Sequence, residues 1–437
     1  MILSVKNGSF KQMIFILFVI FNFFIPGISF SQQEPNEIPN GTEGLTLHVP
    51  VIDSTTGKPN NLDENEKNVG FSTFKVGLGF IYDYVAFSQS DEFKVQMDSA
   101  NLNPEALFKV RDFRIMASGV FKTKREFSWK FAYMYDGDKN EWLVRESGLT
   151  IGVPELAGRI FIGRTKEGYS MVKVMNGHSP WTMERQMAID AVPILADGIK
   201  YFGSLPKSRI FWNLGYFNDI VSKGQGFSTY EWQYDARVGW MPFLDQENSR
   251  LLHLAVNLRY GKPNDGQFRA KSRPEAGAAP FILDSGNFPA EHSFYSGLEA
   301  YYNSGRWMIG SEIVSQKYMS DAGDHHFFGG DIVTSFLLTK TTRPYRTDAS
   351  LFGFVKVNKS IFKGGFGEWE AVLRFSTMDM NDGDITGGSF WRITPMINWY
   401  MSKALRMEFA YGYGQLDRYN IKGNVQLFQA RFQVTAL

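Results

Sequence analysis

The residues best able to do chemistry in this sequence are cations that recur opposite apolar side chains in short alternating segments. In residues 230–240, Arg237 falls on the face opposite Trp232, and residues 252–260 repeat the pattern around Arg259. Guanidinium groups held at fixed positions attract phosphate-like anions and can bind two of their oxygens at once. The spacing therefore predicts a charged surface that attracts anions.

The same alternation assigns a larger set of charges to that face. It comprises the cations Arg114, Lys130, Arg237, Arg259, Arg374, Arg392, Arg406 and Arg431 and the carboxylates Asp112, Glu231, Asp235, Glu370 and Glu408. Some of these groups have a neighbour of opposite charge, as Glu370 has in Arg374 and Glu408 in Arg406. The alternative to anion binding is that such neighbours form ion pairs. A paired cation then shapes the electric field without binding a solute.

Elements with a two-residue period must position these charges. Apolar and polar residues alternate over segments of about 8 to 13 residues, which is the pattern of half-buried β-strands. The expected strands are residues 74–87, 108–121, 127–135, 145–153, 158–165, 198–203, 209–218, 230–240, 252–260, 294–303, 306–316, 326–338, 349–358, 368–378, 391–399, 405–413 and 425–436. Bacterial outer-membrane barrels close with an even number of strands, so we expect that one of these 17 is wrongly divided. The prediction is 16 strands, with 18 as the alternative.

The alternation alone also suits a soluble β-sandwich or propeller. Two features favour a transmembrane antiparallel β-barrel, an all-β fold. Full charges at mid-strand would cost several kcal/mol each to bury in a dry core, whereas a water-filled lumen accepts them. Aromatic residues such as Trp240, Tyr260, Trp399 and Tyr413 lie toward strand ends, where rings sit at the level of the lipid headgroups. We therefore expect one face of each strand to contact lipid and the other to line a channel.

The composition excludes several other classes of protein. Among 437 residues, 16% are aromatic and 21% are charged, with a net charge of +1, so neither a disordered chain nor a nucleic-acid partner is expected. The absence of cysteine excludes disulfides, thiolate zinc sites and thiol catalysis. The carboxylates and histidines of residues 321–326 suit a solvated loop better than a metal site, because adjacent strand residues point in opposite directions. We predict no cofactor and no metal.

The N-terminal residues read as an export signal. Lys6 and Lys11 precede an apolar run over residues 13–25, and small residues precede a cleavage site ahead of Gln32. The run is short for a membrane anchor, which needs about 20 residues. We predict a signal peptide over residues 1–31, a flexible acidic segment over 32–70 and a barrel domain over 71–437.

Six stretches, in order along the chain, carry a resemblance to a known family. They are residues 109–114 (KVRDFR), 163–167 (GRTKE), 181–185 (WTMER), 367–376 (GEWEAVLRFS), 378–383 (MDMNDG) and 398–400 (NWY). The series resembles the phosphate-selective porin O and P family over about residues 108 to 436. The resemblance implies a homotrimer of 16-strand barrels in a Gram-negative outer membrane, with an anion path past wall cations and an inward-folded loop.

Carried onto this sequence, the resemblance implies pore roles for Arg111, Arg114, Lys166 and Arg185. Alternation places Arg111 and Arg114 on opposite faces, which predicts one of them at the strand mouth. Where the family often has Arg-Arg-x-Arg, this chain has Asp112 as the second residue. A carboxylate there weakens anion binding, so we expect a general porin with only a mild preference for anions.

The predicted function is a water-filled channel for small hydrophilic solutes, not an enzyme. The predicted pore and anion-binding residues are Arg111, Arg114, Lys130, Lys166, Arg185, Arg374 and Arg392. The expected partners are outer-membrane lipid, small anions such as phosphate, and two further copies of the chain. The alternatives are a structural or adhesin barrel, or a barrel hydrolase. The pairs His178-Ser179 and His292-Ser293 suggest a hydrolase, but neither has a recognisable third member.

Overall fold

The computed structural model describes residues 51–52, 59–60, 66–102, 104–137, 140–193, 195–221, 229–419 and 421–436. The chain divides into residues 1–40 and 41–437, and all described residues belong to the second unit. The predicted signal peptide and most of the acidic segment lie outside the described residues. Those two assignments therefore stay predictions.

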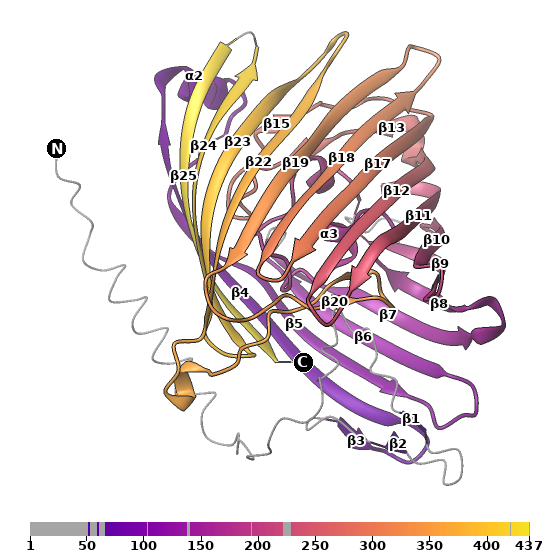
Figure 1. The fold of residues 1–437 in the computed structure, drawn as a ribbon. Coiled ribbons are helices and arrows are strands. Elements are labelled where there is room, and N and C mark those ends of the chain that lie inside the picture. The colour runs from indigo at the N-terminus through magenta and orange to yellow at the C-terminus, as the bar shows by residue number, and fades with distance from the viewer. Residues whose placement is uncertain are drawn as a thin grey trace. The chain divides into compact units, whose positions relative to one another are not determined.

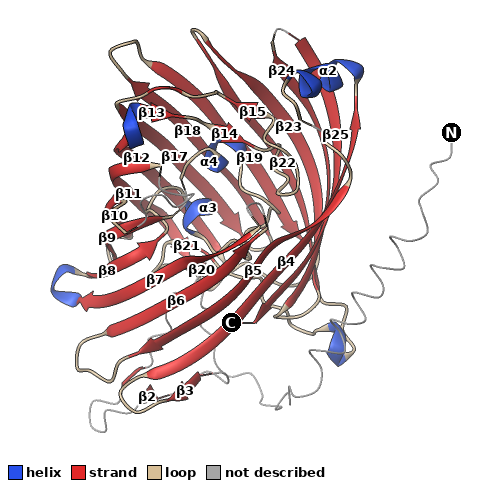
Figure 2. Ribbon diagram, turned by 180° about the vertical axis from the view of Figure 1, so that it is seen from behind, coloured by secondary structure: helices blue, strands red, loops and turns tan. Residues whose placement is uncertain are grey.

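Sixteen antiparallel strands, each hydrogen-bonded to the next in the chain, form a closed barrel (Figures 1 and 2). They are β4 (Thr73–Gln89), β5 (Leu107–Val120), β6 (Phe127–Asp136), β7 (Glu141–Val153), β8 (Gly158–Thr165), β9 (Ala196–Leu205), β10 (Ile210–Asn218), β11 (Tyr230–Asp245), β12 (Arg250–Pro263), β17 (His292–Ser304), β18 (Trp307–Met319), β19 (His325–Leu337), β22 (Glu368–Asp382), β23 (Ile385–Tyr400), β24 (Leu405–Arg418) and β25 (Ile421–Ala436). The barrel closes where β25 pairs with β4. The predicted fold class and the preferred strand number are confirmed.

One of the 17 predicted strands, residues 349–358, is wrong. Only Leu351–Phe352 (β21) is extended, and it pairs with Tyr345–Arg346 (β20) away from the barrel wall. Apolar side chains occupy both alternating positions of this segment, and Leu351, Phe352 and Val355 are all buried. A segment that is apolar on both sides packs inside the molecule instead of dividing lipid from water.

The remaining elements are short. They are β1 (Val51–Ile52), β2 (Pro59–Asn60), β3 (Glu66–Asn68), β13 (Gln267–Phe268), β14 (Lys271–Ser272), β15 (Leu283–Asp284), β16 (Phe288–Pro289), the helices α2 (Asp91–Ser99), α3 (Met171–Val174) and α4 (Met187–Asp190), and the 3-10 turns η1 (Pro154–Leu156), η2 (Asn264–Gly266) and η3 (Ile361–Lys363). None of the helices in the described residues is long and apolar enough to cross a membrane.

The alternation of the wall strands follows the predicted faces. On β11, Tyr234, Val238 and Trp240 are exposed on the outside, while Asp235 and Arg237 are buried on the inside. A two-residue period gives each strand one apolar outer face and one polar inner face. The barrel therefore presents a lipid-compatible surface around a charged interior.

One predicted inward residue is placed wrongly. A shift in the β11–β12 pairing follows Tyr230, which lies inside the barrel with 2% of its surface exposed. Glu231 is half-buried and pairs with Lys262 at 2.8 Å. The extra residue of a β-bulge changes which side chains face inward, so strict alternation fails there.

Three connections between wall strands fold into the barrel. The inner loop (residues 166–195, with α3 and α4) and the mouth loop (residues 264–291, with β13 to β16) enter from one end. The turn-end segment (residues 338–367, with β20, β21 and η3) enters from the opposite end, where the other wall connections are short turns. Figure 2 shows α3 and β20 within the ring of strands.

The inner loop and the turn-end segment meet inside the barrel. Trp181 of the inner loop packs edge-on against Phe352, with ring centroids 5.6 Å apart. The guanidinium of Arg343 lies over the ring of Trp181, 5.4 Å from its centroid. Segments from the two ends of the barrel thus narrow the same part of the lumen.

Candidate functional site

A bulge in β5 brings an additional arginine into the lumen. The pairing with β4 passes from Ile81 opposite Asp112 to Tyr82 opposite Val110, so Arg111 is the extra residue. Its Nη2 donates a hydrogen bond to Glu184 of the inner loop at 2.7 Å. Arg114 also faces inward, where it pairs with Asp112. The prediction that Arg111 and Arg114 lie on opposite faces is therefore wrong, because the bulge interrupts the alternation between them.

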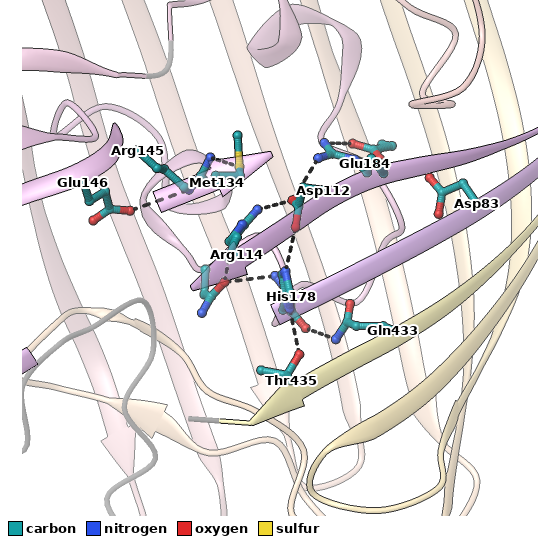
Figure 3. A network of polar contacts seen from close by, with 12 residues as sticks. Asp83, Asp112, Arg114, Met134, Arg145, Glu146, His178, Glu184, Gln433 and Thr435 are labelled. Carbon is teal, nitrogen blue, oxygen red and sulfur yellow. Dashed lines mark hydrogen bonds and ion pairs between the residues drawn. The ribbon is translucent and has the colours of Figure 1, made fainter. Parts of the chain in front are cut away.

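A second bulge, in β7, brings another arginine into the lumen. Glu146 lies opposite Ala132 and Val144 opposite Tyr133, so Arg145 is the extra residue. Arg145 and Glu146 are both buried inside the barrel (Figure 3). Our sequence reasoning missed Arg145 because alternation turns one of two adjacent residues toward lipid. Two adjacent charges within an otherwise amphipathic segment are the signal that could have revealed it.

The inner loop supplies Lys166 and Arg185 to the same part of the lumen. Lys166 Nζ donates to the carbonyl oxygens of Val174, at 3.2 Å, and Met175. Arg185 Nε donates to the carbonyl oxygen of Val172 at 2.9 Å. Among the described residues, neither cation has a carboxylate oxygen within 4.0 Å. Backbone carbonyls thus orient both groups without cancelling their charge.

The charges around Lys166 lower its pKa. Burial lowers the pKa of Lys166 well below its usual range, and the positive charges of Arg185, Arg145 and Arg114 lower it further, against the opposing effect of Glu146. Burial and the charges of Arg111 and Arg114 likewise lower the pKa of Arg185 to about 10, against the opposing effect of Glu184. In both groups burial is the main cause, and neighbouring cations add to it.

We call Arg114, Lys130, Arg145, Lys166 and Arg185 the cationic cluster. Its carboxylates are Asp112, which pairs with Arg114, and Glu146, which lies 2.6 Å from Lys130 Nζ. Five cations less two carboxylates leave a charge of +3.

Gly177 of the inner loop lies close to two of these cations. A Cβ atom at Gly177 would lie 3.3 Å from Arg114 Nη2 and 4.0 Å from Arg185 Nη2. The two guanidinium groups therefore approach one point, which a side chain at that position would fill.

The other predicted arginines contact the mouth loop instead. Arg374 pairs with Glu275 of that loop at 2.6 Å. Arg392 donates to Gln429 Oε1 at 2.7 Å and to the carbonyl oxygen of Pro274, with no carboxylate within 4.0 Å among the described residues. Only one of these two arginines thus keeps an uncompensated charge.

Most remaining wall arginines are neutralised. Arg237 pairs with Glu299 at 2.9 Å, Arg259 with Glu167 at 2.7 Å and Arg431 with Asp83 at 2.7 Å. Glu408 lies 2.9 Å from Arg406, as the sequence suggested. Glu370 pairs with Arg343 of the turn-end segment and not with Arg374. Arg374 has Glu275 of the mouth loop as its own partner.

A hollow leads from the short-turn end to the cationic cluster. A cavity of about 580 Å³ lies among the turns of β5–β6 and β7–β8, and a smaller one of about 130 Å³ reaches Lys130, Lys166 and Lys200. The two share lining residues, including Glu126 and Arg159. Together they form a charged vestibule that ends at the inner loop.

His178 joins the inner loop to the wall, where it lies between Asp112 and Thr435. Its Nδ1 lies 2.7 Å from Thr435 Oγ1, and its Nε2 lies 3.4 Å from Asp112 (Figure 3). Burial lowers its pKa to about 4, as do the charges of Arg114 and Arg145, so the ring is neutral near pH 7. The side chains of His178 and Asp112 are each 1% exposed, so this chain of hydrogen bonds is closed to a substrate.

The His292-Ser293 pair does not form a catalytic site, and the described residues form no metal site. Ser293 Oγ bonds the hydroxyl of Tyr230, whereas the ring of His292 stacks on Tyr260. Among the described residues, no three carboxylate or histidine side chains are arranged to hold a metal ion.

A closed 16-strand barrel with charged inner walls and an inward loop defines the class of outer-membrane porins. The chain belongs to the phosphate-selective porin O and P family, whose profile matches residues 74–435. Membership of this family supports an outer-membrane channel.

Individual relatives are distant. The chain is 28% identical over 183 residues to an uncharacterized protein of Caulobacter vibrioides, covering 41% of this chain and 36% of that one. It is 22% identical over 204 residues to Porin O of Pseudomonas aeruginosa, covering 39% and 45%. The matches thus span less than half of either relative.

Solved structures share the fold. An anion-selective porin from Comamonas acidovorans aligns with a TM-score of 0.54 at 12% identity, over 83% of this chain and 99% of that one. The trimer form of OmpT, an outer membrane protein of Vibrio cholerae, aligns with a TM-score of 0.50 at 12% identity, over 83% and 100%.

Proposed function

We propose that this protein forms a water-filled channel for small hydrophilic solutes, with a mild preference for anions. The observation that carries the proposal is the cationic cluster, where five cations face two carboxylates beside the inner loop. Charged side chains at a constriction set the selectivity of a pore. The whole chain has a net charge of only +1, so the preference comes from where these few groups lie.

The pairing of the other arginines accounts for a mild preference. Arg237, Arg259 and Arg374 each have a carboxylate within 3 Å and contribute little net field. Within the cluster, Asp112 offsets Arg114. Lys166 and Arg185 therefore supply most of the uncompensated charge beside the inner loop.

Phosphate-like oxyanions fit the cluster better than halides do. A guanidinium fork can bind two oxygens of one anion, and Arg114 and Arg185 both approach the backbone at Gly177. A relative named Porin O and a structural neighbour described as anion-selective agree with this proposal.

We further propose that the protein is a homotrimer in the outer membrane of a Gram-negative bacterium. A structural neighbour described in a trimer form supports that assembly. Export would use residues 1–31 as a cleaved signal peptide. Mass measurement of the purified protein checks the cleavage site, and native mass spectrometry checks the trimer.

Reversal potentials in planar bilayers test the proposed selectivity. We expect stepwise conductance, in groups of three, and a mild anion preference in gradients of chloride, phosphate and acetate salts. A variant carrying Arg114→Gln, Lys166→Gln and Arg185→Gln should shift the preference toward cations. The matched control replaces the exposed Lys207, Lys363 and Lys403 with Gln, which removes the same charge outside the barrel lumen.

Two outcomes would contradict the proposal in different ways. An unchanged reversal potential in the triple variant would remove these three residues from the solute path. A bilayer that stays silent while the protein cleaves an ester or a peptide would overturn the channel itself and favour the hydrolase alternative.

A further inference from the structure

The turn-end segment has an outer part that takes no part in lining the lumen. Residues 356–367 contain Lys356, Lys359 and Lys363, and no acid. All three lysines are exposed, and none has a carboxylate oxygen within 4.0 Å among the described residues. Figure 1 shows this part of the chain, in orange, with its short helix at the lower end of the barrel.

Large apolar side chains accompany these charges. Phe362 is 51% exposed and Phe366 is 86% exposed, at the two ends of a turn built around η3 and two glycines. A phenylalanine exposed to this extent in water loses the free energy that burial of its ring would give. A surface of exposed rings and unpaired lysines therefore indicates a partner that is apolar and anionic.

The same turn is fixed to the lipid-facing surface of the barrel. The carbonyl oxygen of Phe366 accepts hydrogen bonds from the indole N–H groups of Trp369, at 3.2 Å, and Trp399, at 2.8 Å. These two indole rings stack with their centroids 5.0 Å apart. Because tryptophan rings of a barrel lie at the level of the lipid headgroups, Phe366 is held at that level too.

More cations flank the site at the same end of the barrel. Lys403 lies in the β23–β24 turn and Arg306 in the β17–β18 turn, and both are exposed. The guanidinium of Arg306 lies 4.8 Å from the ring centroid of Phe336, which packs on Trp307 at 4.4 Å. This end has the short turns, which face the periplasm in outer-membrane barrels.

We propose that residues 356–367 bind anionic phospholipid in the periplasmic leaflet. Phe362 and Phe366 enter the boundary between headgroups and acyl chains. Lys356, Lys359 and Lys363 contact the phosphates, and Lys403 and Arg306 extend the surface on either side. Basic and aromatic side chains next to each other are what attracts a protein surface to anionic lipid. The site is separate from the proposed anion path, since these residues lie outside the lumen.

Native mass spectrometry of the detergent-purified protein, titrated with phosphatidylglycerol or phosphatidylcholine, tests the proposal. The first variant carries Lys356→Gln, Lys359→Gln and Lys363→Gln. The matched control carries Lys122→Gln, Lys124→Gln and Lys207→Gln, three lysines of other short turns at the same end. A second variant carries Phe362→Ser and Phe366→Ser.

We expect the wild type and the control to retain phosphatidylglycerol more strongly than phosphatidylcholine. The lysine variant should bind phosphatidylglycerol about tenfold more weakly or worse, and the phenylalanine variant should bind both lipids more weakly. Single-channel conductance should stay unchanged in the lysine variant and in the phenylalanine variant, which separates this site from the channel. Equal retention of phosphatidylglycerol by the lysine variant and the wild type would overturn the proposal. So would retention by the monomer but not by the oligomer, because a second copy would then cover this surface.

Discussion

Glu184 Oε2 lies 2.7 Å from Nη2 of Arg111, so the inner loop brings its own counter-charge to a wall arginine. The same carboxylate also accepts a hydrogen bond from Arg431. Burial raises the pKa of Glu184, but the charges and hydrogen bonds of Arg111 and Arg431 outweigh that effect and lower it well below its usual range. The loop carboxylate is thus ionised across the physiological pH range, and it suppresses part of the positive field of the wall.

Replacing Glu184 with Gln should strengthen the anion preference. The change removes one negative charge while Arg431 keeps Asp83 as its partner, and Arg111 is left to share Asp112 with Arg114. Reversal potentials in a chloride gradient should move further in the anion-selective direction. Glu247→Gln, in an exposed short turn, is the control and should leave the potential where it was. A move toward cation selectivity would contradict the assignment of Arg111 to the pore.

The anion preference should depend on pH through Lys166. Its folded-state pKa lies well below the ordinary value of 10.5, so its charge is complete below that lowered pKa and is lost as pH rises through it. Anion preference should fall as pH rises through that lowered pKa. Lys166→Arg should keep the preference to higher pH, because guanidinium has an intrinsically higher pKa. Reversal potentials measured over a pH series that extends below and up to 10.5 check both statements, and identical profiles for the two proteins would exclude Lys166 as the titrating group.

Glu167→Gln should destabilise the barrel. Glu167 pairs with Arg259 at 2.7 Å and Lys173 at 3.3 Å, and all three side chains are 0% exposed. Removing the carboxylate leaves two buried cations without a partner, a loss of about 3–5 kcal/mol. The temperature at which the folded form disappears from a semi-native gel measures the loss.

A control variant and the effect of low pH on stability extend the Glu167→Gln test. Glu155→Gln, which removes an exposed ion pair with Arg125, should change the transition little. Burial raises the pKa of Glu167, but the charges of Arg259 and Lys173 lower it below its ordinary value of 4.5 overall. Its stabilising contribution is therefore present above about pH 4.5 and is lost as pH falls through the lowered pKa. The Glu167→Gln variant should therefore lose less stability on acidification than the wild type does.

Phe352→Ala should widen the lumen. The Phe352 ring is fully buried and packs on Trp181 and, at 5.2 Å, on Tyr345. Its loss removes one of the contacts between segments that enter from opposite ends, at a cost of about 3–5 kcal/mol. We expect a larger single-channel conductance. Phe328→Ala, on the lipid-facing side of β19, is the control and should conduct like the wild type.

The barrel wall was predictable because a two-residue period is a local property. Every strand that divides lipid from water carries the pattern, as Trp240 and Arg237 on β11 illustrate. The segment around Phe352 misled the prediction because it has the length of a strand but is apolar on both sides. Burial between two inward segments leaves no such pattern for the sequence to show.

The site was predictable only in part, because its geometry depends on distant partners. The motif resemblance placed Lys166 at the strand end before the inward loop and Arg185 in that loop. The sequence offered no means of matching Arg259 to Glu167, since the two residues lie 92 positions apart. Pairings of that kind decide which arginines keep their charge.

The bulges at Arg111 and Arg145 allow the pore charge to change without disturbing the wall. Each arginine is the extra residue of its bulge, so no residue of the paired strand lies opposite it. Deleting either codon would straighten the strand and leave every flanking residue on its present side. Small in-frame deletions and insertions, and not only substitutions, therefore provide a route by which related channels can gain or lose single positive charges during evolution.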